Sequence, residues 1–190
     1  SAYCCPRDAF SLSDLFLRLG HDSIPRKLLG YWLQQAVELH DKQYNYILQK
    51  YTINSVSEWE TPAVDQTAMI PWCLDRLHQW SGSAAVVNLD LKENEEKIWP
   101  LIQLSARVCA GDSGHAGLAF VEDLHLISSA NPWDRRFGAY LYNNAVVVAG
   151  LRAASRLADH FNQPEAAAWQ ALADRILEYG ILAATTPDGS

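Results

Sequence analysis

Three short segments of the chain combine carboxylates with arginine or tryptophan: residues 3–8, 58–65 and 131–136. Their candidate site residues are Arg7, Asp8, Trp59, Asp65, Trp133 and Asp134. Tryptophan rings stack on the apolar faces of pyranose rings, and charged side chains hydrogen-bond sugar hydroxyls. A carboxyl group close to a glycosidic oxygen can also act as a general acid. Together the segments predict a saccharide-binding cleft, provided that the fold brings them to one place.

Taken one at a time, these residues also have structural interpretations. Arg7 and Asp8 could form a salt bridge at a helix start, where a carboxylate is favourable to the helix dipole. The two tryptophans could anchor loops on the core, and the remaining two aspartates could be helix caps or solvated charges. The recurrence of such residues before each of three apolar stretches favours the saccharide interpretation.

The elements that position these segments are predicted to be helices of two kinds. Residues 27–48, 98–109 and 169–177 show an apolar stripe with a polar opposite face, which indicates amphipathic helices. Residues 9–19, 68–74 and 145–151 are apolar on all sides, which indicates buried helices. The two kinds alternate along the chain, as expected for an all-α fold of helical hairpins with one helix inside and its partner outside. Parallel inner helices would place all three candidate segments at one end.

Local signals leave some of these boundaries open. Pro71 is expected to kink its helix or to shift its boundary. Residues 146–148 are all valine and could form a buried strand, although the alanines around them favour a helix. Two connections are long, at 82–91 and 110–132, and we expect the second to be an ordered loop because it carries several apolar side chains.

Composition excludes several classes of function. A net charge of -7 and a pI near 5.3, without a cluster of Lys or Arg, argue against nucleic-acid binding. No apolar run reaches the roughly 18 residues of a membrane span. The four cysteines include no C-x-x-C pair, and no motif indicates a metal or a cofactor. Buried free thiols would suit the cytoplasm, but four cysteines could also form two disulfides in a secreted protein, so the compartment stays open.

The candidate segments resemble motifs of the glucoamylase-like glycoside hydrolases. Residues 3–9 are similar to the Y-x-W-P-R-D-A opening of that family, and residues 59–68 to its W-E-x-P-x-x-D-Q-T-A segment. Residues 129–138 look like its S-x-D-x-W-E-E-R-x-G loop, and the helix through residues 149–154 fits as well. The resemblance covers nearly the whole chain, in the expected order.

What the resemblance implies is an (α/α)6 barrel that hydrolyses α-linked glucans or related α-glucosides from the non-reducing end, with inversion. By the match, Arg7 and Asp8 would hold the terminal sugar, Trp59 and Trp133 would line neighbouring positions, and Asp65 would support that wall. Asp134 falls where the family has its acid glutamate. Inversion needs a second carboxylate, about 6.5–9.5 Å away, to activate water.

Departures from the family pattern keep other functions open. Asp134 is one methylene shorter than the family's glutamate, and Arg135 replaces its second glutamate. A cation beside Asp134 would lower the pKa of a group that must deliver a proton. Cys5 and Asn131 stand where the family usually has Trp and Asp. One alternative is a catalytically degenerate barrel with a saccharide-binding or regulatory role. The other is a helical-repeat interaction module.

The resemblance also implies that the chain covers only part of a barrel. About six of twelve helices can be counted, so we expect residues 1–190 to be a single partial domain, truncated at both ends. The family's base glutamate would lie beyond these residues. We therefore expect this chain alone to be inactive, with α-glucan or oligosaccharide and the remainder of its own barrel as partners.

Overall fold

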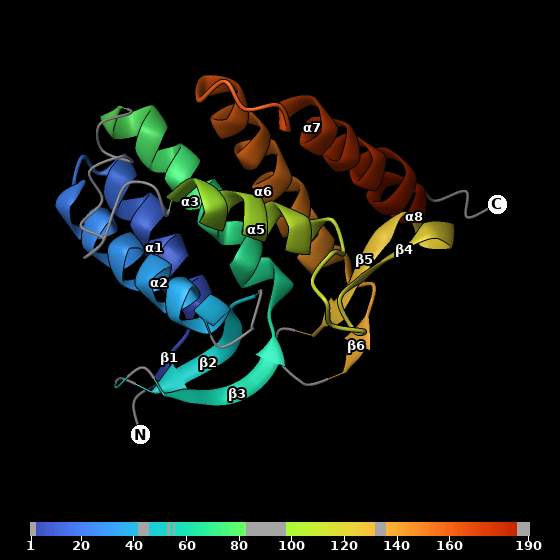
Figure 1. Ribbon diagram of the computed structural model, residues 1–190, viewed down its shortest axis with the longest axis horizontal. Helices are drawn as coiled ribbons and strands as arrows, with labels where there is room; N and C mark the ends of the chain where they lie inside the picture. Colours follow the sequence, from blue (N-terminus) through green and yellow to red (C-terminus); the bar gives the residue numbers. More distant parts are fainter. Residues whose placement is uncertain are drawn as a thin grey trace.

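A computed structural model describes residues 3–41, 46–52, 54, 56–82, 98–131 and 136–185, and most of these are helical (Figure 1). The main helices are α1 (Pro6–Arg18), α2 (Ser23–Asp41), α3 (Val64–Ser81), α5 (Ile98–Cys109), α6 (Leu141–His160) and α7 (Ala166–Arg175). A π-helix, η3 (Ile176–Leu182), and a short α8 (Ala183–Thr185) follow α7. The predicted all-α class is confirmed in that helices dominate. Within the described ranges, no helix is long and apolar enough to cross a membrane.

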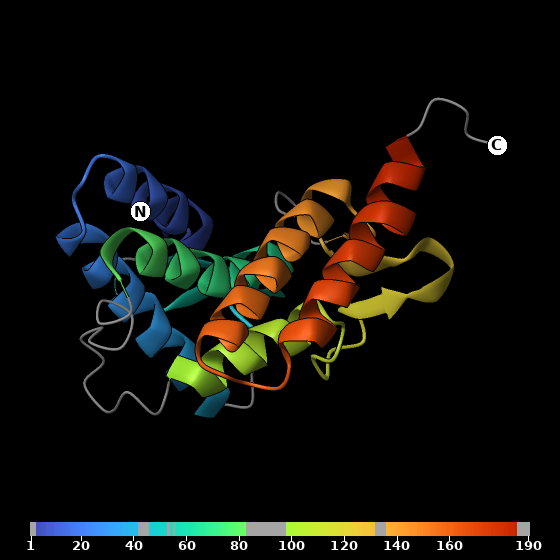
Figure 2. The same ribbon diagram turned by 90° about the horizontal axis from the view of Figure 1, so that it is seen from above.

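The helices pack as three consecutive hairpins. α1 packs against α2, α3 against α5, and α6 against α7, while α3 also lies between α1 and α6 (Figures 1 and 2). Helices α1 and α6 therefore lie on either side of α3, and we call these three the inner helices. The valines at 146–148 are helical, so the alternative interpretation of a strand is wrong.

Burial along the inner helices is uneven. α3 is covered on nearly every side, and it continues through Pro71 without a break, so the alternative that this proline shifts the helix boundary is wrong. α1 is not buried on all sides as predicted, because Leu12 and Leu15 are about half exposed and Leu19, just after the helix, is 62% exposed. The difference follows from position, since α1 has neighbours on fewer sides than α3.

Two small antiparallel sheets accompany the helices. The first joins β1 (Tyr3–Cys4), β2 (Leu48–Thr52) and β3 (Ser57–Pro62), in that order. The second joins β4 (Ala119–Val121), β5 (Leu126–Ala130) and β6 (Phe137–Gly138), with the 3-10 turn η2 (Glu122–Leu124) between β4 and β5. Both sheets lie towards the end where α3 and α6 begin (Figure 1).

These strands correct three sequence-based expectations. The helix predicted for 27–48 ends at Asp41, and its last predicted residue starts β2. The segment 58–62, expected to be a loop, is part of β3, and the expected loop 110–132 contains β4, η2 and β5. Strands of two to six residues that are partly buried have too few positions to show an alternating pattern in the sequence.

The inner helices approach closely at one crossing. A Cβ added at Gly150 of α6 would lie 2.5 Å from the carbonyl oxygen of Ala68 in α3. Because such a contact is too short for a carbon and an oxygen, only glycine lets the two helices meet at this distance. The crossing is otherwise lined by buried aliphatic side chains such as Val147 and Leu151.

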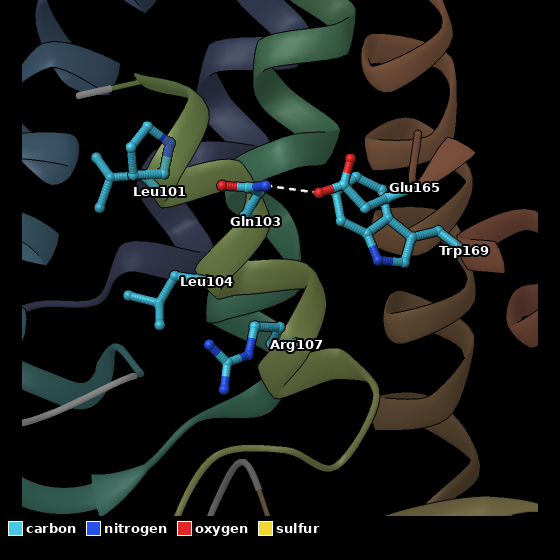
Figure 3. A pocket seen from close by; sticks show the side chains of 7 residues that line it. Leu101, Gln103, Leu104, Arg107, Glu165 and Trp169 are labelled. Atoms are coloured by element: carbon cyan, nitrogen blue, oxygen red, sulfur yellow. Dashed lines mark hydrogen bonds between the residues drawn. The ribbon is translucent and has the colours of Figure 1, made fainter. Parts of the chain in front are cut away.

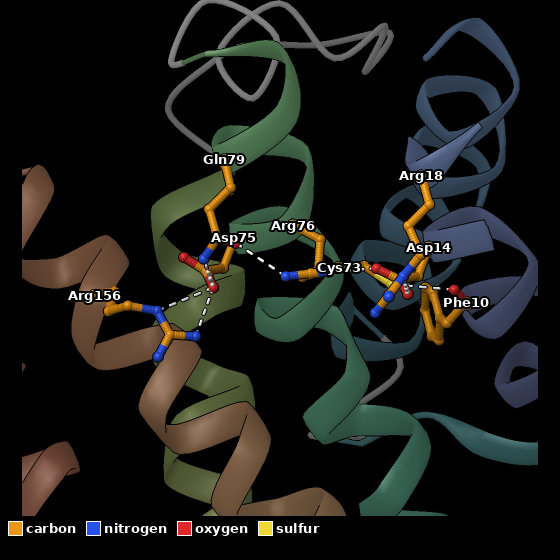
Figure 4. Close-up of polar contacts among 8 residues, drawn as sticks. All are labelled: Phe10, Asp14, Arg18, Cys73, Asp75, Arg76, Gln79 and Arg156. Carbon is orange, nitrogen blue, oxygen red and sulfur yellow. Dashed lines mark hydrogen bonds and ion pairs between the residues drawn. The ribbon is translucent and has the colours of Figure 1, made fainter. Parts of the chain in front are cut away.

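Ion pairs tie the same three helices together further along (Figure 4). Asp14 of α1 accepts hydrogen bonds from Arg76 of α3 at 2.8 Å and from Arg18 of its own helix at 2.6 Å. Asp75 of α3, whose side chain is 2% exposed, accepts from Arg156 of α6 at 2.6 Å. Each buried carboxylate therefore has a guanidinium partner on the neighbouring inner helix.

The π-helix η3 contacts the second sheet where the chain leaves α7. A Cβ on Gly180 would lie 2.6 Å from the carbonyl oxygen of His125 and 2.5 Å from a methyl carbon of Leu126. His125 itself has a left-handed backbone, with φ of 50°. Arg175 Nε donates to Nδ1 of His125 at 3.2 Å and holds this turn against the helix.

Candidate functional site

An ion pair joins two of the candidate segments. Arg7, in the first turn of α1, donates Nε to Oδ2 of Asp65, in the first turn of α3, at 2.6 Å. The two residues are 58 positions apart, and the exposed fractions of their side chains are 19% and 2%. Burial alone would lower the pKa of Arg7, but the hydrogen bond and the charge of Asp65 outweigh that effect and raise it. The start of α1 is thereby fixed against the start of α3.

Tyr142 brings the start of α6 to the same place. It lies in the first turn of that helix and is 41% exposed. Burial raises the pKa of its phenol, the carboxylate of Asp65 adds to the rise, and the charge of Arg7 opposes it. Asp8 also raises the pKa of Tyr142, so the charges of Arg7, Asp8 and Asp65 all act on this hydroxyl. Three helix starts therefore converge on one polar cluster, which we call the Arg7 cluster: Arg7, Asp8, Asp65 and Tyr142.

The cluster has one buried face and one open face. Asp65 is enclosed, whereas Asp8 is exposed in the first turn of α1. Nη2 of Arg7 is buried and has no hydrogen-bond partner among the described residues. The side chain of Arg7 also hydrogen-bonds Tyr142, and this bond opposes the rise in the pKa of that phenol.

The remaining predicted site residues are placed only in part. Trp59 lies on β3, where its backbone pairs with Lys50 of β2. Trp133 and Asp134 lie outside the described residues, as does Arg135. The backbone on either side of that gap is described, and Asn131 N donates to the carbonyl of Arg136 at 2.8 Å. The third candidate segment is thus anchored at both ends beside β6.

Two buried asparagines at the start of α6 hold β5, which leads into the third segment, and the sequence motifs did not single them out. Asn144 Nδ2 donates to the carbonyls of Ile127 and Tyr140, both at 3.0 Å, and its Oδ1 accepts from Ile127 N at 2.7 Å. Asn143 Nδ2 donates to Ser129 Oγ at 2.6 Å and to the carbonyl of Ala130 at 2.8 Å. The signal for them in the sequence is a pair of amides in an otherwise apolar helix, which require partners when buried.

The four cysteines are unpaired. Cys73 and Cys109 are buried, as the free-thiol interpretation predicts, while Cys4 and Cys5 are only half-buried. Burial raises the pKa of the Cys5 thiol, and the carboxylate of Asp8 adds to the rise, so this thiol is protonated at neutral pH. Among the described residues, no group of three or more His, Cys, Asp or Glu is placed to hold a metal ion.

A groove of about 410 Å³ opens elsewhere, between α5 and α7 (Figure 3). Leu101, Leu104 and Trp169 form its apolar part, and Gln103 donates to Glu165 at 2.6 Å across it. None of the candidate site residues lines this groove. It lies on the outer helices, away from the helix starts that form the Arg7 cluster.

Comparison with known proteins assigns no family to the chain. No protein-family model matches it, and a search of curated proteins finds no match. The candidate site is therefore defined by the convergence of three helix starts on Arg7, Asp8, Asp65 and Tyr142.

Proposed function

We propose that this chain is a segment of a glucoamylase-like glycoside hydrolase, which binds the non-reducing end of an α-linked gluco-oligosaccharide at the Arg7 cluster. The supporting observation is the ion pair between Arg7 and Asp65, because it joins two segments whose residue types each indicate saccharide chemistry. Tyr142 adds the start of α6, which follows the third segment after the short strand β6.

The chemistry of the cluster suits a neutral, polyhydroxylated ligand. Asp8 presents an exposed carboxylate as acceptor, and the Tyr142 hydroxyl, in a side chain that is 41% exposed, can both donate and accept. A sugar offers adjacent hydroxyls that serve as donor and acceptor together, so it can satisfy such a mixed set. Asp65 contributes by holding the guanidinium in place rather than by touching the ligand.

Hydrolysis with inversion requires an acid and a base on opposite sides of the sugar. In this proposal Asp134 is the acid that protonates the leaving oxygen, and the water-activating carboxylate comes from outside this chain. The remainder of the barrel would supply it. The arginine at position 135 and the shorter acid at position 134 favour a second candidate, a barrel that retains saccharide binding without hydrolysis.

Isothermal titration with maltotriose and acarbose, together with a glucose-release assay, tests the proposal. We expect saturable binding of both ligands and no glucose release from this chain alone. Asp8→Asn should weaken binding by about 1.5–3 kcal/mol, because the ligand hydroxyls lose a charged hydrogen-bond acceptor on the protein. Turnover by a complete barrel, lost in Asp134→Asn, would distinguish hydrolysis from binding alone.

Asp159→Asn is the matched control, because Asp159 is an exposed aspartate near the far end of α6. It lies 17 residues from Tyr142 on that helix, or about 25 Å at 1.5 Å per residue. The control should bind like the unmodified chain. A folded chain that binds neither ligand would refute the saccharide site and leave only the helical fold.

A further inference from the structure

A second feature near the helix starts is an exposed aromatic ring with a rigid support. Phe137 of β6 is 42% exposed, yet its ring stacks on the imidazole of His115, with centroids 5.5 Å apart and planes 17° from parallel. Tyr46 meets the same imidazole edge-on at 5.7 Å and 89°. The three rings form an ordered stack whose outermost member is Phe137.

The backbone beneath the ring is shaped to receive it. A Cβ on Gly117 would overlap the Phe137 ring, so this position has room only for glycine. Gly117 N donates to His115 Nδ1 at 3.0 Å, which fixes the orientation of the imidazole. The neutral imidazole must then carry its proton on Nε2. Ser113 Oγ accepts from His115 N at 3.0 Å and holds the turn.

The stack is close to the Arg7 cluster along the chain. Five residues lead from Phe137 to Tyr142, so the two Cα atoms are at most about 18 Å apart. Directly after Tyr142, Asn143 and Asn144 fasten the start of α6 to β5, which itself pairs with β6. Phe137 and Tyr142 therefore lie on neighbouring segments, β6 and α6, that are both held by β5.

We propose that Phe137 is a distal saccharide subsite, on which a pyranose ring of an extended α-glucan stacks while the terminal sugar occupies the Arg7 cluster. This inference rests on the proposed function and deepens it, because it selects oligosaccharides over disaccharides. A flat, exposed ring that is held from behind offers contact area to a sugar at small conformational cost. His115 Nε2 provides a hydrogen-bond donor beside it.

The test is a chain-length series of ligands measured by isothermal titration. The unmodified chain should bind maltoheptaose more tightly than maltose. Phe137→Ala should weaken maltoheptaose binding by about two- to tenfold and leave maltose binding unchanged. Phe137→Tyr, which keeps the flat ring, should retain the preference, whereas Phe137→Leu, which keeps apolar volume alone, should lose it. Thermal unfolding of each variant establishes that it is folded.

Trp80→Ala serves as the control, since Trp80 is also an exposed aromatic residue, 53% exposed near the opposite end of α3. It should bind both ligands like the unmodified chain. A folded Phe137→Ala variant that keeps the full preference for maltoheptaose would overturn this inference and leave the proposed function intact. Failure of the unmodified chain to bind any saccharide would overturn both.

Discussion

Gly150 of α6 lies directly against the backbone of Ala68 in α3, at the crossing of the two most extensively packed helices. This approach sets the separation of the inner helices and hence of their starts, where Asp65 and Tyr142 lie. The position of the candidate site thus depends on a residue that carries no functional group.

Gly150→Ala tests that dependence. Alanine normally favours a helix over glycine by about 1 kcal/mol. Here we expect the opposite sign, a loss of about 1–3 kcal/mol in the free energy of unfolding, because the added methyl group overlaps the carbonyl of Ala68. Urea denaturation measures the change. An alanine variant as stable as the unmodified chain would show that the crossing has room to adjust.

Asp65→Asn should destabilise the fold by about 1–3 kcal/mol, because it leaves the guanidinium of Arg7 partly buried without its anion. It should also weaken maltotriose binding, since Arg7 loses its fixed position. Chemical denaturation and titration measure the two effects. Asp22→Asn is the control: its pair with Arg26 is far more exposed and should contribute less than about 1 kcal/mol. Equal losses in the two variants would contradict this prediction.

Stability should depend on pH through Asp14. Burial alone would raise the pKa of this carboxyl, but hydrogen bonds from Arg76 and Arg18 outweigh burial and lower it below the ordinary value of 3.8. A lowered folded-state pKa means that the contribution is complete above pH 3.8 and is lost as the pH falls through the folded value. Asp14→Asn should therefore lower the Tm at pH 7, and the difference should shrink below about pH 4.

Melting curves of both proteins between pH 2.5 and pH 7, at roughly half-unit steps, follow this difference. Asp112→Asn is a suitable control, because its pair with Arg107 is 63% exposed on both sides. Its effect should stay within about 0.5 kcal/mol at every pH. A difference between Asp14→Asn and the unmodified chain that persists unchanged at about pH 2.5 would refute the assignment.

Asn144→Ala should cost at least about 2 kcal/mol, because it leaves the buried amide and carbonyl of Ile127 without partners. It should also weaken saccharide binding without contacting the ligand, since β5 leads into the third candidate segment. Urea denaturation and titration with maltotriose report on the two effects. Asn162→Gly is the control, because Asn162 is exposed with φ of 54°, a conformation that glycine adopts freely.

The helical part of the fold could be predicted from the sequence because burial leaves a strong pattern over ten or more residues. The apolar stretches 68–74 of α3 and 145–151 of α6 lie in helices that are largely buried, and their partners α5 and α7 are striped as expected. The exposed leucines of α1 could not be anticipated, because exposure there depends on how many helices surround α1. The strands have only two to six residues, which is too few for an alternating pattern, and β1 pairs with a strand from a distant part of the chain.

The site was predictable to a similar degree. Residue types placed Arg7 and Asp65 in one hypothesis, and the structure brings them to 2.6 Å. Tyr142 was not singled out, because a tyrosine at the start of an apolar helix has no local mark of function. Phe137 was not singled out either, because the position of its ring is set by stacking on His115, which lies 22 residues earlier in the chain.

The π-helix at 176–182 has a consequence for how chains of this type can differ in length. Such a turn closes its hydrogen bonds one residue later than an α-helix does, so it accommodates an extra residue without ending the helix. Losing one residue here would return the turn to α-helical geometry, because the wide π-turn offsets the roughly 100° that one residue adds to an α-helix. A one-residue gap at this point in a homologous chain would therefore leave the flanking helix faces in place, but it would remove the wide turn that sets Gly180 against His125.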